Sequence, residues 1–558
     1  MNTYRIAFGA AACVLVLMTT GLFPAAVPPG AEKVDYSLLQ KTRQEGVFEF
    51  LVLLREQADL SVARAVPLKA EKGLLVHRLL TGLAARTQAP LLKLIEENGG
   101  SHRAFWIVNL VWVQGDAALL FKLAARPEVA GILDNPTIFQ ELPRSEDSRD
   151  TSRQPADLAW NLDRIGVPET WASGALGQGV VIGGIDTGYA WQHPALKPSY
   201  RGWDGSQADH DYNWHDAVHG GGGGNCGHDS EQPCDDYGHG THTMGIMTGD
   251  GGPGNQIGVA PEARWIGCRC MNQGFGTPAM YIECLQWMLA PTDLAGRNAD
   301  PARAPHVINN SWSCTYGEGC SDPNVLKGAI EALRAAGIVV VVAAGNLGSA
   351  CATVREPPSI YEASFTVGST TFQDGASSFS GRGPVTADGS QRLKPDLAAP
   401  GSDIRSAYPG DSYQFMSGTS MAAPHVAGAV ALLISASPGL AGDPDQLESI
   451  LRSTAQPMFT SQDCGGIPGQ QTPNHTFGHG RVDVWAAVQS VTKIQGDLNS
   501  DRLCDSADLV LLQDYLAENI VHGQAGFTAD LEQADLNGDG RVDAGDLLLL
   551  RRKITPGD

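Results

Sequence analysis

Three short motifs hold an aspartate, a histidine and a serine in a form that could do chemistry together. They are residues 185–188 around Asp186, 238–242 around His239, and 417–428 around Ser420. Amide hydrolysis needs a nucleophile, a base for its proton, an acid that orients the base, and donors that stabilise an oxyanion. Serine, histidine and aspartate can fill the first three roles, so the motifs predict nucleophilic catalysis.

Each motif lies next to an element that could hold it in place. Residues 180–185 form a continuous apolar run, as in a strand buried on both faces, and Asp186 follows directly. Asn346 comes just after a second run, residues 338–344. Functional groups gather at the carboxyl ends of parallel strands, so both are expected at one sheet edge. Ser420 opens a helix of small and apolar residues, where the dipole and unpaired N–H groups favour negative charge.

The order of predicted elements indicates an α/β fold with several domains. A helix over residues 324–336 precedes the second apolar run, and such alternation gives a parallel sheet with helices on both faces. A chain of 558 residues is too long for one compact core. The formal net charge of −22 argues against nucleic acid as a partner, because nucleic-acid binding needs a basic face.

The motifs, in the order Asp, His, Ser, resemble those of the subtilisin family of serine endopeptidases, with residues 158–491 as the peptidase domain. The resemblance implies that Ser420 is the nucleophile, His239 the base, and Asp186 the group that orients His239. It also implies that the side-chain amide of Asn346 and the N–H of Ser420 bind the oxyanion. An acyl-enzyme intermediate in the hydrolysis of protein substrates follows from these roles.

The resemblance also places a pocket for the substrate residue before the scissile bond. Its walls are expected from Ser311, Trp312 and Ser313 on one side and from Ala343, Ala344 and Gly345 on the other. Ser313 stands where the family usually has glycine, which puts a broad apolar preference in doubt. The pocket floor aligns with residues 354–357, where a charge would alter specificity, and the sequence leaves open which side chain points in. His242 and His425 are expected to be packing residues.

The N-terminus has the features of a secretory signal peptide over residues 1–26. Arg5 precedes an apolar run over residues 6–17, and the small residues Ala25 and Ala26 follow. A membrane anchor is the alternative, but the run is short for a full span and no second long apolar stretch follows. We therefore expect a secreted protein, extracellular or associated with the cell surface, with no stable membrane span after signal cleavage.

Residues 45–142 are expected to form a small α+β domain with a split β-α-β pattern. Strands are predicted over residues 48–54, 105–113 and 129–133, and helices over 76–97 and 116–125. The family resemblance implies a propeptide that assists folding and inhibits the enzyme until it is cut. An unrelated substrate-binding domain is the alternative. The polar residues 143–157 are expected to be an exposed linker that contains the maturation site.

Export also makes disulfides the expected state of the cysteines. Of 11 cysteines, Cys13 leaves with the signal peptide, and residues outside the cytosol usually pair. Cys226 with Cys234, and Cys314 with Cys320, are the short-range candidates. The sequence leaves the pairing of the others open.

The insert between Asp186 and His239 makes a zinc-dependent hydrolase one alternative function. Its residues of zinc-ligand type are His210, His215, His219, Cys226, His228, Cys234, Asp235 and Asp236. The His-Glu-x-x-His pattern usual in zinc proteases is absent around His239 and His242. A catalytically inactive binding scaffold is the other alternative, but no triad position is substituted.

The last segment, residues 496–555, contains an acidic loop twice, each followed by a leucine-rich helix, over residues 509–516 and 547–554. Loop positions one, three, five, nine and twelve hold Asp497, Asn499, Asp501, Asp505 and Asp508 in the first copy and Asp535, Asn537, Asp539, Asp543 and Asp546 in the second. Oxygen ligands at this spacing can bind Ca²⁺, whereas the chemistry itself needs no cofactor. The repeat resembles a dockerin, which implies a cohesin domain as partner; a calcium-stabilised spacer is the alternative.

Overall fold

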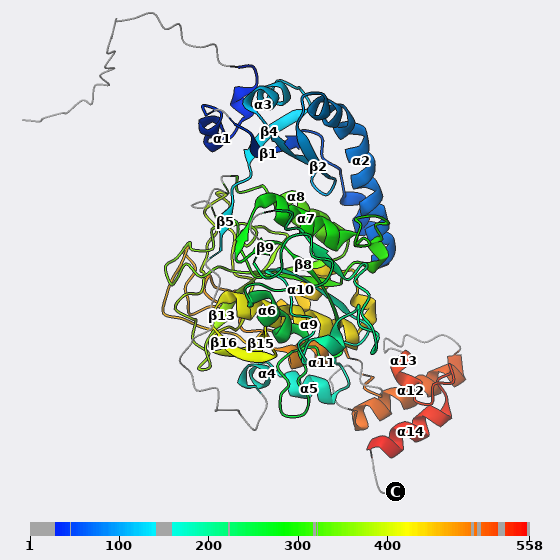
Figure 1. The fold of residues 1–558 in the computed structure, drawn as a ribbon. Coiled ribbons are helices and arrows are strands. Elements are labelled where there is room, and N and C mark those ends of the chain that lie inside the picture. Colours follow the sequence, from blue (N-terminus) through cyan, green and yellow to red (C-terminus); the bar gives the residue numbers. More distant parts are fainter. Residues whose placement is uncertain are drawn as a thin grey trace, which may run out of the picture.

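The computed structural model describes residues 28–44, 46–140, 159–220, 224–315, 320, 322–492, 496–498, 504–522 and 531–554. The expected signal peptide, residues 1–26, and the expected linker, residues 143–157, lie outside the described residues and stay predictions. The described chain forms an N-terminal α+β unit, a large α/β unit and a helical tail (Figure 1).

The N-terminal unit is a four-stranded antiparallel sheet in the order β2-β3-β1-β4. Its elements are α1 (Tyr36–Lys41), β1 (Phe48–Leu54), α2 (Lys69–Glu97), β2 (Ser101–Phe105), β3 (Leu110–Gly115), α3 (Ala117–Ala124) and β4 (Val129–Asp134). From β1 onward the order is β-α-β-β-α-β, in agreement with an α+β fold. The single strand predicted over residues 105–113 is wrong, because Asn109, at a φ of 42°, turns the chain between β2 and β3.

The large unit is built on a seven-stranded parallel sheet, which confirms the predicted fold class. The strand order is β14-β13-β12-β11-β6-β8-β7. The strands are β6 (Val181–Asp186), β7 (Trp214–Asp216), β8 (Arg264–Arg269), β11 (Val307–Asn310), β12 (Val339–Ala343), β13 (Phe365–Thr370) and β14 (Leu397–Pro400). β12 consists of four valines and an alanine and is buried along its whole length, as in a strand covered on both faces.

Helices pack on both faces of this sheet. They are α4 (Trp160–Arg164), α5 (Val167–Ala172), α6 (His239–Thr248), α7 (Pro278–Leu289), α8 (Lys327–Ala335), α9 (Thr419–Ala436), α10 (Pro444–Ser453) and α11 (Val484–Val491). Along β12, Val340 and Val342 pack in one apolar cluster with α7 and α8, whereas Val339 and Val341 pack in another with α9. Because side chains alternate along a strand, α7 and α8 cover one face and α9 the other.

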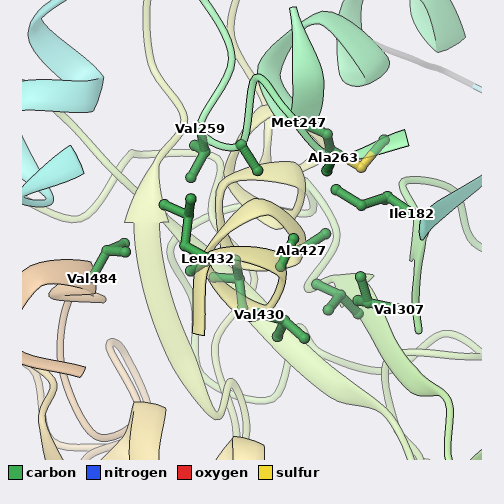
Figure 2. Packing of buried hydrophobic residues seen from close by; sticks show 14 of the residues in the cluster. Ile182, Met247, Val259, Ala263, Val307, Ala427, Val430, Leu432 and Val484 are labelled. Atoms are coloured by element: carbon green, nitrogen blue, oxygen red, sulfur yellow. The ribbon is translucent and has the colours of Figure 1, made fainter. Parts of the chain in front are cut away.

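Helix α9 fills the centre of the second cluster. Figure 2 shows Ala427, Val430 and Leu432 of α9 among apolar side chains from the sheet and from neighbouring segments. Glycine allows this close approach, since a Cβ atom on Gly428 would lie 2.5 Å from the Cβ of Val259. Within the described residues, α9 is the one helix long and apolar enough to cross a membrane, and 89% of it is buried inside the protein.

Two small sheets and the tail complete the described chain. One sheet, in the order β5-β10-β9, contains β5 (Ile138–Phe139), β9 (Met271–Asn272) and β10 (Phe275–Gly276), and the other pairs β15 (Ile404–Tyr408) with β16 (Ser412–Met416). The tail contains α12 (Ser506–His522), α13 (Leu531–Ala534) and α14 (Ala544–Ile554). The leucine-rich stretches that the sequence predicts as helices lie within α12 and α14, and Leu512 packs with Leu550 in the core of the tail.

Four disulfides cross-link the described part of the large unit. They join Cys226–Cys234, Cys268–Cys284, Cys314–Cys320 and Cys351–Cys464. The first and third are the short-range pairs that the sequence predicts. The fourth spans 113 residues, so only the fold shows which cysteines it brings together.

Replacement of Leu432 by alanine is expected to destabilise the large unit by about 2–5 kcal/mol, because a fully buried side chain leaves a cavity when truncated. The temperature midpoint of thermal unfolding is measured, and it should be lower in this variant than in the unchanged chain. The matched control is Leu294→Ala, since Leu294 is 43% exposed in a turn and its loss should change little. Equal midpoints for Leu432→Ala and the unchanged chain would contradict the central place of α9.

Candidate active site

Three elements bring the predicted triad to the carboxyl edge of the parallel sheet. β6 ends at Asp186, α6 begins at His239, and Ser420 is the second residue of α9. Ser311 follows β11, which pairs with β6, and Asn346 follows β12, the next strand along. The site therefore forms where the topology of a parallel sheet places functional groups.

Asp186 and His239 form a buried hydrogen-bonded pair. The Nδ1 atom of His239 donates to Oδ1 of Asp186 at 2.7 Å, and the two side chains are 0% and 1% exposed. Asp186 Oδ1 also accepts the N–H of Thr187 at 2.7 Å, and Oδ2 accepts the hydroxyl of Thr243 at 3.4 Å. With Nδ1 engaged, Nε2 is the ring nitrogen that can take a proton. Within the described residues, the buried His239 Nε2 has no hydrogen-bond partner.

Ser420 is held beside the end of β11. Its hydroxyl donates to the backbone carbonyl of Ser311 at 3.0 Å, and the hydroxyl of Ser311 donates to the carbonyl of Ser420 at 3.0 Å. The Ser420 hydroxyl therefore bonds to a carbonyl here and not to His239. Catalytic hydrogen bonds of this kind are often long or poorly aligned until substrate binds.

The side chain of Asn346 lies against the first turn of α9. Its Oδ1 atom accepts both the N–H and the hydroxyl of Thr419, each at 2.9 Å. With Oδ1 turned toward Thr419, the N–H donors of the Asn346 amide, on Nδ2, point away from Thr419. Asn346 is exposed, so its donor can reach a bound substrate.

Asp235 is a positioning residue that the sequence analysis placed only among zinc-type ligands. Its Oδ1 accepts the hydroxyl of Thr187 at 2.9 Å and the N–H of Gly238 at 2.7 Å. Its Oδ2 accepts the N–H and the hydroxyl of Thr241 at 2.9 and 2.6 Å. Asp235 thus ties the turn after Asp186 to the first turn of α6. The signal that could have revealed it is an aspartate just ahead of a helix start, where carboxylates accept unpaired N–H groups.

His242 and His425 are buried and bonded to backbone carbonyls, as expected for packing residues. His242 Nε2 donates to the carbonyl of Gln414 at 3.0 Å, and burial lowers the pKa of His242 to about 3. His425 Nδ1 donates to the carbonyl of Met421 at 2.8 Å, and burial lowers the pKa of His425 to about 4. Both rings are therefore neutral near neutral pH.

Trp312 belongs to the core under the predicted pocket. Its ring stacks on Tyr281 with 4.1 Å between ring centroids, and its Nε1 donates to the carbonyl of Ile185 at 3.0 Å. On the other predicted wall, Ala343 and Ala344 are buried. A Cβ atom added to Gly345 would meet nothing within 4 Å, so open space lies beside this glycine.

A segment that follows the N-terminal unit lies along the Ser313 side of the pocket. β5 pairs antiparallel with β10, and the N–H of Gln140 donates to the carbonyl of Gly274 at 2.9 Å. The amide of Gln140 then bridges Ser313: its Nε2 donates to the carbonyl of Ser313, and its Oε1 accepts the N–H of Ser313 at 3.3 Å. An extended chain thus lies between β10 and the wall that contains Ser313.

The zinc-type residues of the insert have other partners. Cys226 and Cys234 form a disulfide, so they are not thiolate ligands. His215 and His219 both contact Oε1 of Glu283, at 2.9 and 2.8 Å. Among the described residues of the insert, no group of three or more His, Cys, Asp or Glu residues is arranged to hold a metal ion.

The tail contains the second acidic loop and part of the first, since Asn499 and Asp501 lie outside the described residues. The carboxylate at position twelve plays the same part in each loop. Asp508 accepts the N–H of Leu498 at 2.7 Å, and Asp546 accepts the N–H of Leu536 at 2.8 Å. The hard oxygen donors of both loops suit Ca²⁺.

Comparison with known proteins defines the class. Residues 177–480, more than half of the chain, match the Subtilase family, and residues 495–555 match the Dockerin type I domain. The chain belongs to the subtilase family and carries a dockerin type I domain.

The chain is 33% identical to bacillopeptidase F of Bacillus subtilis (strain 168), over 82% of this chain and 32% of that protein. Residues 160–166, and the stretch from residues 284–287 to residues 307–312, also indicate a similarity to bacillopeptidase F. The chain is 32% identical to serine protease AprX of the same strain, over 50% of this chain and 61% of that protein. It is 30% identical to subtilisin DY of Bacillus licheniformis, over 60% of this chain and 99% of that protein. The chain thus spans about a third of bacillopeptidase F and less than two thirds of AprX.

Proposed function

We propose that this chain is a secreted serine endopeptidase that hydrolyses peptide bonds of proteins through Asp186, His239 and Ser420. The observation that carries the proposal is the buried 2.7 Å bond between Asp186 and His239, with Ser420 at the start of α9. Membership of the subtilase family supports the same reaction. Four disulfides support export, because disulfides persist outside the reducing cytosol.

In the first step, the Ser420 hydroxyl leaves the Ser311 carbonyl, gives its proton to Nε2 of His239 and attacks the carbonyl carbon of the scissile bond. Asp186 keeps Nδ1 protonated and stabilises the imidazolium that forms. His239 then gives the proton to the leaving amine, and an acyl-enzyme remains on Ser420. Water, activated by the same histidine, releases the acyl group.

The oxyanion of the tetrahedral intermediate needs donors that are already in place. Nδ2 of Asn346 is one, since Oδ1 is held by Thr419, the residue before the nucleophile. The N–H of Ser420, in the first turn of α9, is the second, and the helix dipole adds to its field. Both donors act without reorganisation during the reaction.

Ser420→Ala is expected to reduce protein hydrolysis by about 10⁴-fold or more, because the nucleophile is lost. The uncut full-length chain should then accumulate. Casein hydrolysis and the mass of the secreted protein measure the two effects. Ser453→Ala, an exposed serine on α10, is the matched control and should keep full activity. Hydrolysis at the unchanged rate by Ser420→Ala would sink the proposal.

We also propose that residues 45–142 are an inhibitory propeptide and that cleavage falls in residues 143–157. The contact that supports this is Gln140, which holds Ser313 in the predicted substrate groove. Figure 1 places the N-terminal unit beside α7 and α8 of the large unit. Arg103 of β2 pairs with Glu283 of α7 at 2.6 Å, and the N–H of Trp106 donates to the side chain of Gln286 at 2.7 Å.

The Arg103–Glu283 pair lies inside a cluster of titratable groups. His219 contacts Glu283 at 2.8 Å and Asp229 at 2.5 Å, His215 contacts the same oxygen of Glu283, and His228 contacts Asp229. Burial lowers the pKa of His219, but the hydrogen bond and charge of Glu283 raise it above its ordinary value overall. The charge of Arg103 opposes that rise.

This arrangement links protons to release of the N-terminal unit. When Arg103 leaves, one influence that lowers the pKa of His219 leaves with it. The released form therefore binds protons more tightly than the bound form. By linkage, the complex is most stable while His219 is neutral in both forms, and its stability falls as the pH drops through the histidine range.

Acidification from about pH 8 to about pH 5 is expected to release the cut N-terminal unit, because protonated His219 competes with Arg103 for Glu283. The Ser420→Ala chain, cut in the linker by a trace of active enzyme, provides the sample. The share of N-terminal unit that co-elutes with the large unit is the readout. His219→Gln should flatten the pH dependence, whereas His102→Gln, whose ring pairs with Glu96 inside the N-terminal unit, should not. Equal co-elution at both pH values would contradict the link.

For the tail, we propose that residues 496–555 bind Ca²⁺ through the two acidic loops and attach the enzyme to a cohesin domain. The match to the Dockerin type I domain supports both parts. The ligands are Asp497, Asn499, Asp501, Asp505 and Asp508, and Asp535, Asn537, Asp539, Asp543 and Asp546. Bound Ca²⁺ would neutralise the clustered carboxylates and stabilise the packing of α12 on α14. Catalysis does not pass through this module.

Ca²⁺ is expected to protect the tail of the full chain against limited proteolysis, because metal binding orders the loops. The Ser420→Ala chain avoids self-digestion, and samples with Ca²⁺ and with a chelator are compared by mass spectrometry. Asp539→Asn, at loop position five, should weaken the protection. Asp514→Asn, an exposed carboxylate on α12 outside the loops, is the matched control. Identical digestion with and without Ca²⁺ would refute the calcium proposal.

A further inference from the structure

The segment of β5 and Gln140 indicates where a substrate peptide would bind. β5 pairs with β10, and Gln140 continues the strand to Gly274 and Ser313. An extended segment held by backbone bonds on a strand edge is how a peptide binds to a sheet. The groove therefore runs past Ser313. Ser311, two residues before Ser313, exchanges hydrogen bonds with Ser420, so Ser313 lies at most about 7 Å along the chain from the residue that contacts the nucleophile.

A carboxylate is fixed at the Ser313 wall. The hydroxyl of Ser313 donates to Oε2 of Glu356 at 3.0 Å. The next residue in each segment adds a backbone bond, since the N–H of Cys314 donates to the carbonyl of Pro357 at 2.7 Å. The carbonyl of Glu356 accepts the N–H and the hydroxyl of Ser359 at 3.1 and 2.7 Å. These bonds hold the backbone that follows the Cα atom of Glu356 next to the segment that contains Ser313.

The sequence aligned residues 354–357 with the pocket floor, and their side chains differ in exposure. Val354 and Pro357 are buried, and Arg355 is exposed. Glu356 is partly buried and is the residue whose side chain bonds to the wall at Ser313. The opposite wall is made of small residues, with open space beside Gly345. A substrate side chain that enters here meets small walls and a carboxylate.

We propose that Glu356 makes this protease prefer peptide bonds that follow an arginine or a lysine. The inference rests on the proposed endopeptidase function and names its substrate class. A cation on a long stem can reach a carboxylate while its methylenes contact Ala343 and Ala344, whereas an acidic side chain is repelled. The linker that the enzyme must cut contains three residues of this class, Arg144, Arg149 and Arg153.

The test uses the processed full chain and peptides that differ only in the residue before the scissile bond: arginine, lysine, leucine or glutamate. The arginine peptide is expected to exceed the leucine peptide about tenfold in kcat/KM, a difference that falls as salt is raised. Glu356→Gln keeps the shape and can still accept the Ser313 hydrogen bond. It should reduce the ratio of arginine to leucine hydrolysis about tenfold and leave leucine hydrolysis within about twofold.

Glu362→Gln is the matched control, because Glu362 lies on the same loop, is 84% exposed and pairs with Arg392. It should leave the ratio of arginine to leucine hydrolysis unchanged. An unchanged ratio in Glu356→Gln, with the leucine peptide still cleaved, overturns this inference and leaves the proposed function intact. A preference for the glutamate peptide also overturns it and assigns the pocket charge to Arg355. Failure of the processed enzyme to cleave any peptide overturns the proposed function as well.

Discussion

The hydrogen bond between Asp186 and His239 sets the conditions that the surrounding structure must meet. A carboxylate that is 1% exposed is unfavourable unless its oxygens are engaged. Asp186 meets this condition with the imidazole of His239, the N–H of Thr187 and the hydroxyl of Thr243. Thr187 is the residue after β6, and Thr243 lies one turn into α6. The pair is therefore satisfied only when the strand and the helix meet at this one point.

Close backbone approach at that point explains why glycine follows the histidine. A Cβ atom on Gly240 would lie 2.1 Å from the carbonyl oxygen of Gly188 and 3.0 Å from the Cβ of Asp186. Gly188 has a φ of 111°, and a Cβ atom on it would lie 1.8 Å from the carbonyl oxygen of Cys234, which leaves no room for a side chain. A larger residue in place of Gly240 would push α6 away from β6, and one in place of Gly188 would displace the segment around Cys234. The Asp186–His239 contact therefore requires glycine at positions 188 and 240.

The sequence predicted features that depend on local pattern and missed those that depend on long-range packing. Buried strands β6 and β12 were visible as apolar runs, and the triad as three motifs. The turn at Asn109 was missed because buried Ile107 and Val108 keep the apolar run continuous through it. Asp235 was classified with metal ligands because its hydrogen bonds to Thr187 and Gly238 appear only once the insert is folded. Glu356 could be aligned with the pocket, but its contact with Ser313 depends on how two loops pair.

In the proposed function, the interface between the N-terminal unit and the large unit has to meet two opposite requirements, and its contacts fit both. Before the linker is cut, the unit is tethered, so its high effective concentration favours binding even through modest contacts. Lys72 to the carbonyl of Gly442, Arg103 to Glu283, and Gln140 to Ser313 are such polar contacts. After cleavage the tether is lost, and the same contacts must hold a dilute partner. Because Arg103 pairs with Glu283 beside His219, the interface contains a contact that protonation of His219 can weaken. In the proposed function, cleavage and acidification would then act in sequence on one interface, the first removing the tether and the second removing the charge pair.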